Sequence, residues 1–333
     1  MKYSFILSMI FCLSFISCDQ EDGELIISPE ESAPIVKQVA TFPVITEKNI
    51  TYAEGLSHDS LNSSNYTVIP IKLDIYAPNN SSKDRPVFMF IHGGAFENGS
   101  KSQAAIVNIA NFFASRGWVF ISIDYRLKGD TGTVPEEWAS FASSLPVSDD
   151  NKASFNAMYP AQRDAKAALR WIIANKDNYN INADYITVGG ASAGANTAKG
   201  IVISDLNDFT DEISTVQDPT LLTTNLEEIY TVQTIIDFWG GQSVTDAFEV
   251  VYGRDLFDPN DPVLYKAHGT ADFTVPFSSA LDLQEIYESI GVTMKLDTLI
   301  GVGHGDFKAT LNNKSLEELA FDFITEQQNL IVE

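Results

Sequence analysis

The sequence predicts an α/β fold in which helices flank both faces of a mostly parallel central sheet. Short continuous apolar runs, each bounded by Gly, Pro or a polar loop, are typical of strands buried on both faces. Helical stretches separate these runs, and this alternation indicates a doubly wound sheet. The chain has no internal repeat and no low-complexity tract, so we expect one folded domain after an N-terminal leader.

The predicted elements follow one another along the chain. An alternating strand covers residues 71–76. Continuous apolar strands are predicted at residues 87–91, 119–123, 185–188, 232–238 and 263–267, and another strand-like piece covers 294–300. Helices are predicted at residues 161–175, 278–289 and 315–327.

The chain is strongly acidic, with 45 Asp and Glu against 21 Lys and Arg and a formal net charge of −24. This charge would repel the phosphates of nucleic acid and anionic lipid headgroups, so we expect no nucleic-acid partner. The only cysteines, Cys12 and Cys18, precede the folded domain, which therefore has no thiolate metal site. The histidines lack any metal-ligand spacing, so no metal site is expected.

The N-terminal region is predicted to export and anchor the protein. Residues 1–17 are typical of a signal peptide, because Lys2 precedes an apolar stretch that is shorter than a membrane span. The sequence Phe15-Ile-Ser-Cys18 resembles a bacterial lipobox, although Phe15 stands where Leu is usual. Lipid on Cys18 would anchor the chain to a bacterial membrane. The alternative is an ordinary signal peptide with an incidental cysteine.

Residues 18–48 are polar and acidic, which predicts a flexible tether before a folded domain at residues 49–333. An acidic run after a lipidated cysteine also resembles a signal for export to the cell surface. The alternative is a solvated spacer with no such role.

A predicted strand runs into Gly-Gly190-Ala-Ser192-Ala-Gly194 and then into a predicted helix. The glycines of this GxSxG pattern permit a sharp strand-to-helix turn that holds the serine in a strained, exposed position. The helix that follows directs its N–H groups at the site and favours negative charge there. The pattern predicts Ser192 as a nucleophile; the alternative is a glycine-rich turn with a serine cap.

A second glycine-rich loop, His92-Gly-Gly94-Ala95-Phe, follows the predicted strand at residues 87–91. Such a loop can present backbone N–H groups about 3 Å from an oxyanion, because no side chain blocks the approach. The loop resembles the HGGGF of the hormone-sensitive-lipase and carboxylesterase branches of the α/β-hydrolase superfamily. Matched residue by residue, this resemblance makes Gly94, Ala95 and Ala193 the oxyanion donors. Ala95 replaces the third glycine, and His92 is expected to be a scaffold residue.

In the α/β-hydrolase fold the catalytic residues follow the order serine, acid, histidine. Only His268 and His304 follow the nucleophile, and His268 sits in an apolar strand. His304 lies in a flexible glycine loop after a predicted strand, which suits a base that shuttles a proton near neutral pH. We therefore expect His304 to be the base.

The acid would orient the histidine and stabilise its cation. Residues 268–272, followed by Val275 and Pro276, resemble the HGxxDxxVP turn of many α/β-hydrolases, in which the aspartate is the triad acid. This resemblance assigns Asp272. The competing residues are Asp237, at the end of the preceding strand, and Asp306, two residues after the histidine.

The resemblance spans about residues 67–328 and implies a serine esterase that needs no cofactor. Residues 124–127 also resemble the YRL of esterases, with Arg126 expected in a salt bridge. A prolyl-oligopeptidase-type peptidase is the second hypothesis, but the chain has no propeller-sized extra domain. A non-catalytic esterase-like binding protein is the third, and the intact catalytic set argues against it.

Residues 128–158 and 206–230 are long and polar, whereas residues 242–262 leave little room for a cap. This predicts an open pocket for small-molecule or glycan-linked esters with short or aromatic acyl groups. The two segments could instead form a lid, with Trp138, Phe141 and Leu145 beneath it. Five aromatic residues are pocket candidates, although each is more often part of a core: Trp138, Phe141, Tyr159, Trp239 and Phe307.

Overall fold

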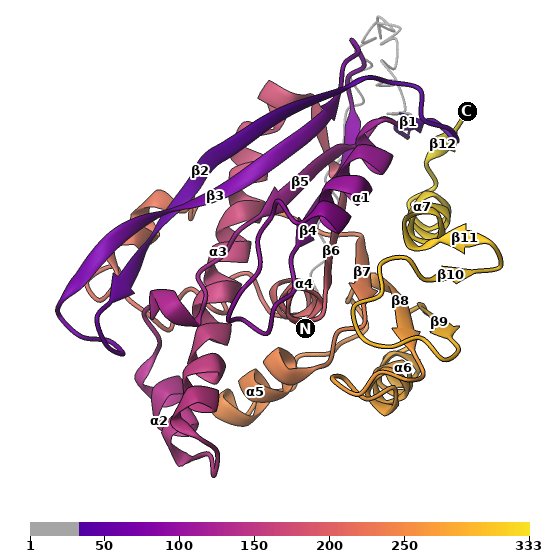
Figure 1. Cartoon of the computed structure of the whole chain (residues 1–333). Coiled ribbons are helices and arrows are strands. Elements are labelled where there is room, and N and C mark those ends of the chain that lie inside the picture. Colours follow the sequence, from indigo (N-terminus) through magenta and orange to yellow (C-terminus); the bar gives the residue numbers. More distant parts are fainter. Residues whose placement is uncertain (1–32) are drawn as a thin grey trace, which may run out of the picture. The chain divides into compact units, whose positions relative to one another are not determined.

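The computed structural model describes residues 33–333 (Figure 1). The predicted signal peptide, Cys18 and the first part of the predicted tether lie outside the described residues. Within residues 33–333, no helix combines the length and the apolar composition that crossing a membrane requires.

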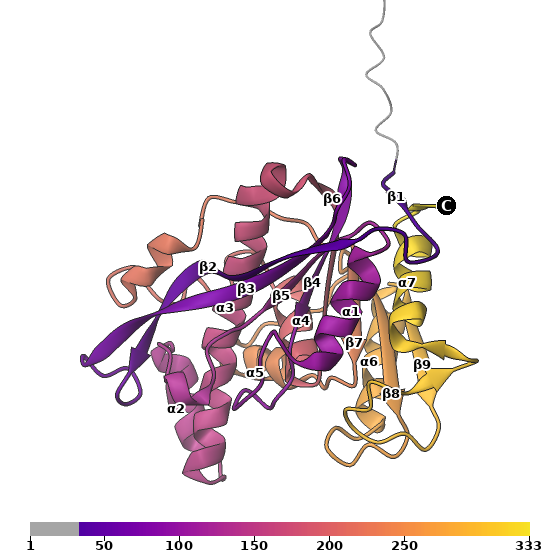
Figure 2. The same cartoon turned by 45° about the horizontal axis from the view of Figure 1, so that its top comes forward.

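An eight-stranded sheet forms the centre of the fold (Figure 2). Its strands lie in the order β2-β3-β5-β4-β6-β7-β8-β9. Strands β2 and β3 are antiparallel to their neighbours, and the six strands from β5 to β9 run parallel. The bounds are β2 Val44–His58, β3 Tyr66–Pro78, β4 Arg85–Ile91, β5 Val119–Ile123, β6 Ile181–Ala191, β7 Thr234–Phe238, β8 Val263–Gly269 and β9 Met294–Leu299.

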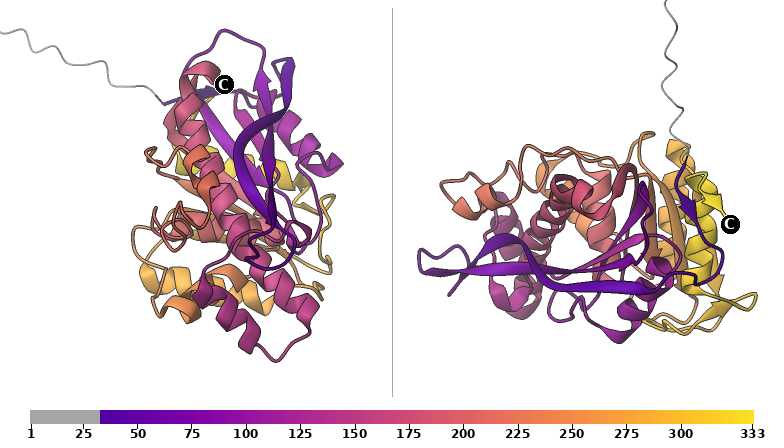
Figure 3. Two further views of the ribbon diagram at one scale, coloured as in Figure 1. Left: turned by 90° about the vertical axis from the view of Figure 1, so that its left-hand side faces the viewer. Right: turned by 90° about the horizontal axis from the view of Figure 1, so that it is seen from above.

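Helices cover both faces of this sheet. Side chains of β4 alternate between two apolar clusters, since Met89 packs with α3 and α4 whereas Phe88 packs with α1 and α7. Figure 3 (left) shows α1 and α3 on opposite sides of the sheet. The bounds are α1 Ala104–Ala114, α2 Glu136–Ser144, α3 Asp149–Tyr179, α4 Ala193–Ile203, α5 Ser243–Tyr252, α6 Ser278–Ile290 and α7 Leu316–Gln327. This arrangement confirms the predicted α/β class.

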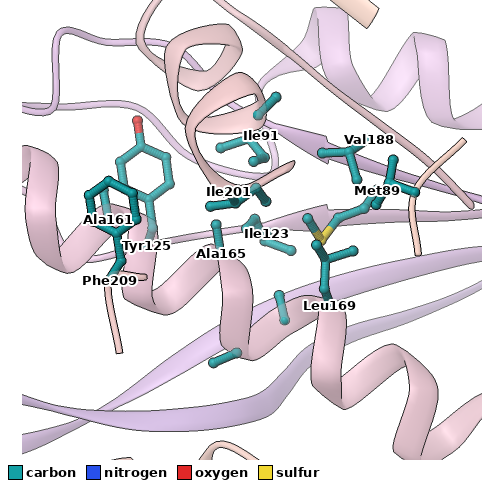
Figure 4. Packing of buried hydrophobic residues seen from close by; sticks show 14 of the residues in the cluster. Met89, Ile91, Ile123, Tyr125, Ala161, Ala165, Leu169, Val188, Ile201 and Phe209 are labelled. Carbon is teal, nitrogen blue, oxygen red and sulfur yellow. The ribbon is translucent and has the colours of Figure 1, made fainter. Parts of the chain in front are cut away.

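Small side chains bring α3 close to the sheet. Ala161 and Ala165 are fully buried and lie, with Leu169, on the side of α3 that packs against the strands (Figure 4). Met89 and Ile123 meet that face from β4 and β5. Burial of apolar area stabilises by about 25 cal/mol per Å², so this contact fixes the layer that supports the sheet.

The described fold starts earlier than the predicted boundary at residue 49. Strand β1 (Ile35–Val36) pairs in parallel with β12 (Ile331–Val332), and β2 begins at Val44. The first half of β2 is largely exposed, because β2 is an edge strand. Its polar composition therefore resembles that of a spacer, and this is why the sequence places residues 33–48 in the tether.

Helix α3 also starts earlier than the predicted helix at residues 161–175. Ser148 caps it by accepting a hydrogen bond from the N–H of Asn151 at 3.3 Å. Pro160 lies inside the helix, where it removes one backbone donor and marks an apparent boundary in the sequence. Most of the segment 128–158 is consequently helical, in α2 and the first turns of α3. A short hairpin of β10 (Thr310–Leu311) and β11 (Lys314–Ser315) precedes α7.

Candidate active site

The structure brings the predicted site residues to one edge of the sheet. The loop containing Gly94 follows β4, Ser192 follows β6, Asp272 follows β8 and His304 follows β9. Because these strands are parallel, their carboxyl ends meet at the same edge, where open α/β sheets bind ligands.

Ser192 occupies a sharp turn between β6 and α4. Its backbone has φ 55° and ψ −120°, a left-handed conformation that is uncommon outside glycine. The glycines at positions 190 and 194 are required sterically. A Cβ at Gly194 would approach the Ile91 carbonyl oxygen to 2.1 Å, and one at Gly190 would lie 2.4 Å from Gly194. The turn therefore holds Ser192 in a strained position at the surface.

His304 connects the serine to a carboxylate. Its Nδ1 lies 2.7 Å from Asp272 Oδ2, and its Nε2 lies 2.9 Å from Ser192 Oγ. A carboxylate can only accept, so Nδ1 carries the proton and donates it to Asp272. The lone pair of Nε2 is then free to accept from the serine hydroxyl. The His304 side chain keeps 21% of its surface exposed, whereas that of Asp272 is fully buried.

Asp272 is held as an anion by its own turn. Burial alone would raise its pKa, but hydrogen bonds from His304 and from the backbone N–H groups of Val275 and Thr274 outweigh burial. Both backbone donors lie 2.8 Å from Asp272 Oδ1. The pKa of this carboxyl therefore lies below its usual value, so the group stays ionised at neutral pH and its orientation is fixed.

The glycine loop after β4 adopts the shape that an oxyanion site needs. Gly94, Ala95 and Phe96 all have positive φ, at 127°, 57° and 61°. A Cβ at Gly94 would lie 1.9 Å from the Asn98 carbonyl oxygen, so this position requires glycine. Ala193 is the first residue of α4, where N–H groups have no partner within the helix. The three predicted donors thus flank Ser192, with Gly94 and Ala95 in the wall of its pocket.

The competing acids have other partners. Asp237 is fully buried between Lys199 and Lys266, and its carboxylate accepts hydrogen bonds from both ammonium groups. Asp306 is exposed and accepts a hydrogen bond from the N–H of Lys308 at 3.0 Å. The structure therefore pairs only Asp272 with His304.

His268, His92 and Arg126 have partners other than Ser192 and His304. His268 donates from Nε2 to the carbonyl of Val275, in the turn that follows Asp272, at 2.9 Å. Burial lowers the pKa of both His268 and His92, which favours their neutral forms. Arg126 forms the predicted salt bridge, with Nη2 2.7 Å from Asp164 Oδ1.

A pocket of about 350 Å³ opens over Ser192. Trp239 and Phe307 form one apolar wall, with their ring centroids 4.9 Å apart. Asn98 and Gln103 contribute amides elsewhere in the lining. Neither could be predicted from the sequence, because both lie in an ordinary polar loop. Of the five predicted aromatic candidates, only Trp239 and Phe307 reach this pocket.

The other aromatic candidates lie elsewhere. Trp138 stacks on Phe155 at 5.0 Å, and Phe209, from the segment 206–230, packs against it at 6.3 Å. The two long segments therefore meet, but neither contributes a residue to the wall of the pocket over Ser192. Among residues 33–333, no group of three or more His, Cys, Asp or Glu side chains could hold a metal ion.

Comparisons with known proteins find similar sequences among carboxylesterases. Residues 71–216 match a family model described as the carboxylesterase family. Carboxylesterase 1C of Rattus norvegicus is 30% identical over 220 residues, which cover 62% of this chain and 36% of that protein. Para-nitrobenzyl esterase of Bacillus subtilis is 29% identical over 141 residues, covering 40% of this chain and 25% of that protein. The chain thus spans about a third or less of the length of these relatives.

Solved structures show the same fold. A propionate-bound esterase from Thermogutta terrifontis superposes with a TM-score of 0.57 at 21% identity, covering 84% of this chain and 94% of that one. The same esterase phosphorylated by paraoxon gives a TM-score of 0.57 at 22% identity, with the same coverage. A carbohydrate esterase from gut microbiota, in truncated form, gives 0.57 at 19% identity and covers 88% of this chain and 99% of that one. The protein therefore has an α/β-hydrolase fold, and its sequence is similar to carboxylesterases.

Proposed function

We propose that the protein is a serine hydrolase that cleaves carboxylic esters through an acyl-enzyme. One observation carries this proposal: His304 contacts Ser192 Oγ at 2.9 Å and Asp272 at 2.7 Å in the tautomer that a general base requires. The carboxylesterase-like relatives support an ester as the substrate.

In this proposal each residue carries one step. Ser192 Oγ attacks the ester carbonyl carbon while its proton passes to His304 Nε2, and the backbone N–H groups of Gly94, Ala95 and Ala193 hold the oxyanion. The bond to the alcohol then breaks as His304 returns the proton to the leaving oxygen. Water then attacks the acyl carbon while His304 takes one of its protons, and His304 returns that proton to Ser192 Oγ as the bond to the serine breaks and the carboxylic acid leaves.

The same pocket supports a substrate class. It is open, and Trp239 and Phe307 supply an apolar wall of limited size, which favours short or aromatic acyl groups. The segments 128–158 and 206–230 do not cover it, so a bulky alcohol such as a glycan can extend into solvent. The resemblance in fold to a carbohydrate esterase is compatible with this class.

A series of soluble acetate, butyrate and octanoate esters tests both parts of the proposal, with Ser192→Ala as the matched variant. We expect kcat/KM to be greatest at four carbons or fewer. Ser192→Ala should lose several orders of magnitude while remaining folded. Retention of more than a few per cent of the activity by the variant would exclude the mechanism. A maximum at the octanoate ester would exclude only the short-chain preference.

We also propose that the chain is exported and lipid-anchored to a bacterial membrane through Cys18. The signal-like residues 1–17 and the lipobox-like residues 15–18 support this. A glycerol or palmitate label on the wild-type protein that is absent from Cys18→Ser is the expected result.

A further inference from the structure

Two large apolar side chains stand in solvent beside the candidate active site. Phe273 is 97% exposed, and Ile300 is 81% exposed. Exposed apolar residues scattered singly are common, but these two belong to the turns that hold Asp272 and His304. An apolar side chain that packs against nothing contributes nothing to the fold, so its position at the site calls for a functional explanation.

The backbone presents Phe273 rigidly. Phe273 lies between Asp272, which contacts His304, and Thr274, which lines the pocket over Ser192. The carboxylate of Asp272 accepts the N–H groups of Thr274 and Val275 at 2.8 Å, which fixes the backbone on the C-terminal side of Phe273. The ring is therefore attached to a fixed turn whose next residue, Thr274, lines the pocket, while Phe273 itself stands in solvent outside the lining.

The turn that contains Ile300 is hydrogen-bonded to the turn that contains Phe273. The N–H of Ala271 donates to the Val302 carbonyl at 3.0 Å, and the N–H of Gly301 donates to Thr270 Oγ1 at 2.8 Å. Ile300 and Phe273 thus belong to two adjoining turns on the histidine side of the pocket.

The chemistry places the alcohol of the substrate on this side. His304 Nε2 must return a proton to the leaving oxygen, so that oxygen lies within hydrogen-bond reach of the imidazole. The remainder of the alcohol then leaves the pocket past the loops around His304. These loops include Phe273, whereas the oxyanion donors Gly94 and Ala95 contact the carbonyl.

We propose that Phe273, with Ile300 in the adjoining turn, forms a leaving-group subsite that binds the aromatic or bulky apolar alcohol portion of an ester. This inference rests on the proposed esterase function. It is independent of the acyl preference, because the acyl chain and the alcohol are separate substituents of the carbonyl carbon and only the alcohol leaves during acylation.

Benzyl butyrate and ethyl butyrate, each below its solubility limit, test the subsite. Both form the same butyryl-enzyme, so the alcohol acts only through acylation, which kcat/KM reports. Phe273→Ala should lower kcat/KM for benzyl butyrate by about tenfold, equal to about 1.4 kcal/mol, and change that for ethyl butyrate less than twofold. Phe273→Tyr, which keeps the ring, should retain the wild-type ratio.

Val216→Ala is the matched control, because Val216 is 91% exposed and lies in the segment that does not line the pocket. It should leave both substrates unchanged. An unchanged benzyl-to-ethyl ratio in Phe273→Ala overturns the subsite, as does an equal loss on both esters, which would mean that the turn of Asp272 is disturbed. A loss confined to emulsified tributyrin would assign Phe273 to a lipid surface instead. If the wild type hydrolyses neither soluble ester, the esterase function itself fails.

Discussion

Tyr125 contacts His92, the first residue of the glycine loop that holds Gly94 and Ala95. Its hydroxyl donates to the His92 carbonyl at 3.0 Å, and its ring stacks on the His92 imidazole with centroids 4.4 Å apart. Burial raises the pKa of Tyr125, so the hydroxyl remains a donor at any working pH. The contact sits two residues before Gly94 and restrains a loop whose positive φ values cost conformational energy.

Tyr125→Phe should lower kcat about fivefold and leave KM nearly unchanged, because a lost hydrogen bond of about 1 kcal/mol loosens donors that act mainly in the transition state. Affinity for a boronic acid, which mimics the tetrahedral intermediate, should fall in parallel. Tyr76→Phe is the control, since the buried Tyr76 hydroxyl has no hydrogen-bond partner among the described residues. Equal losses in both variants would show a general packing effect instead.

At the residue scale, motifs predicted the candidate catalytic residues that the structure brings together, but not the residues that hold them. GxSxG and the glycine loop around His304 require particular residue types at fixed spacing, so Ser192 and His304 could be identified. Tyr125 lies in the recognised stretch 124–127, yet its hydroxyl acts on a loop more than thirty positions away. The exposure of Phe273 likewise follows from the tertiary fold and has no local signal.

At the element scale, one buried charge cluster joins α4, β7 and β8. Asp237 on β7 accepts hydrogen bonds from Lys199 on α4 and Lys266 on β8, and all three are fully buried. Burial alone would raise the pKa of Asp237, but the two lysines outweigh it and hold that pKa well below its usual value. Because the folded-state pKa is depressed, the cluster stabilises the fold above the unfolded pKa of about 4, and this stability is lost as pH falls further.

Asp237→Asn should therefore destabilise the protein by about 3–5 kcal/mol, since it leaves two buried ammonium groups without a counter-charge. Asp272→Asn should have the opposite profile: a fall in kcat of about 10⁴-fold with little change in the urea midpoint. Urea unfolding and kcat, measured on both variants, separate a structural acid from a catalytic one. A catalytic loss of that size in folded Asp237→Asn would contradict the assignment of Asp272.

At this scale, the bounds of strands and helices could be predicted from the sequence where the residues are buried, and not where they are exposed. The parallel strands were predictable because they are buried on both faces. The apolar run at residues 119–123, for example, has the same bounds as β5. Strand β2 was missed before residue 49 because an exposed edge strand lacks such a run. The early start of α3 was missed because Pro160 interrupts the pattern inside the helix.

At the scale of the whole domain, the candidate site and the start of the described chain lie at opposite ends of the parallel strands. The candidate catalytic residues lie where the parallel strands end. The described chain begins near the amino ends of these strands. The N–H of Lys37 donates to the Arg116 carbonyl and that of Thr41 to the Ser115 carbonyl, and both carbonyls precede β5. The first described residues therefore lie at the other end of the strands from the candidate catalytic residues.

We predict that membrane-bound wild type and soluble Cys18→Ser have equal kcat/KM, within about twofold, on soluble butyrate esters. The reason is that the first described residues and the candidate catalytic residues lie at opposite ends of the strands. The assay compares isolated membranes with the soluble fraction at matched active-site concentrations. A several-fold gain on release from the membrane would show that anchoring obstructs the pocket.

The central claim is that Ser192, activated by His304, forms the covalent intermediate. The most direct measurement is peptide mass spectrometry after the folded protein reacts with an organophosphate such as paraoxon. The account predicts a single adduct on the peptide that contains Ser192, formed far more slowly in His304→Ala and absent from Ser192→Ala. An adduct on another residue, or ester hydrolysis that continues after Ser192 is fully modified, would contradict it.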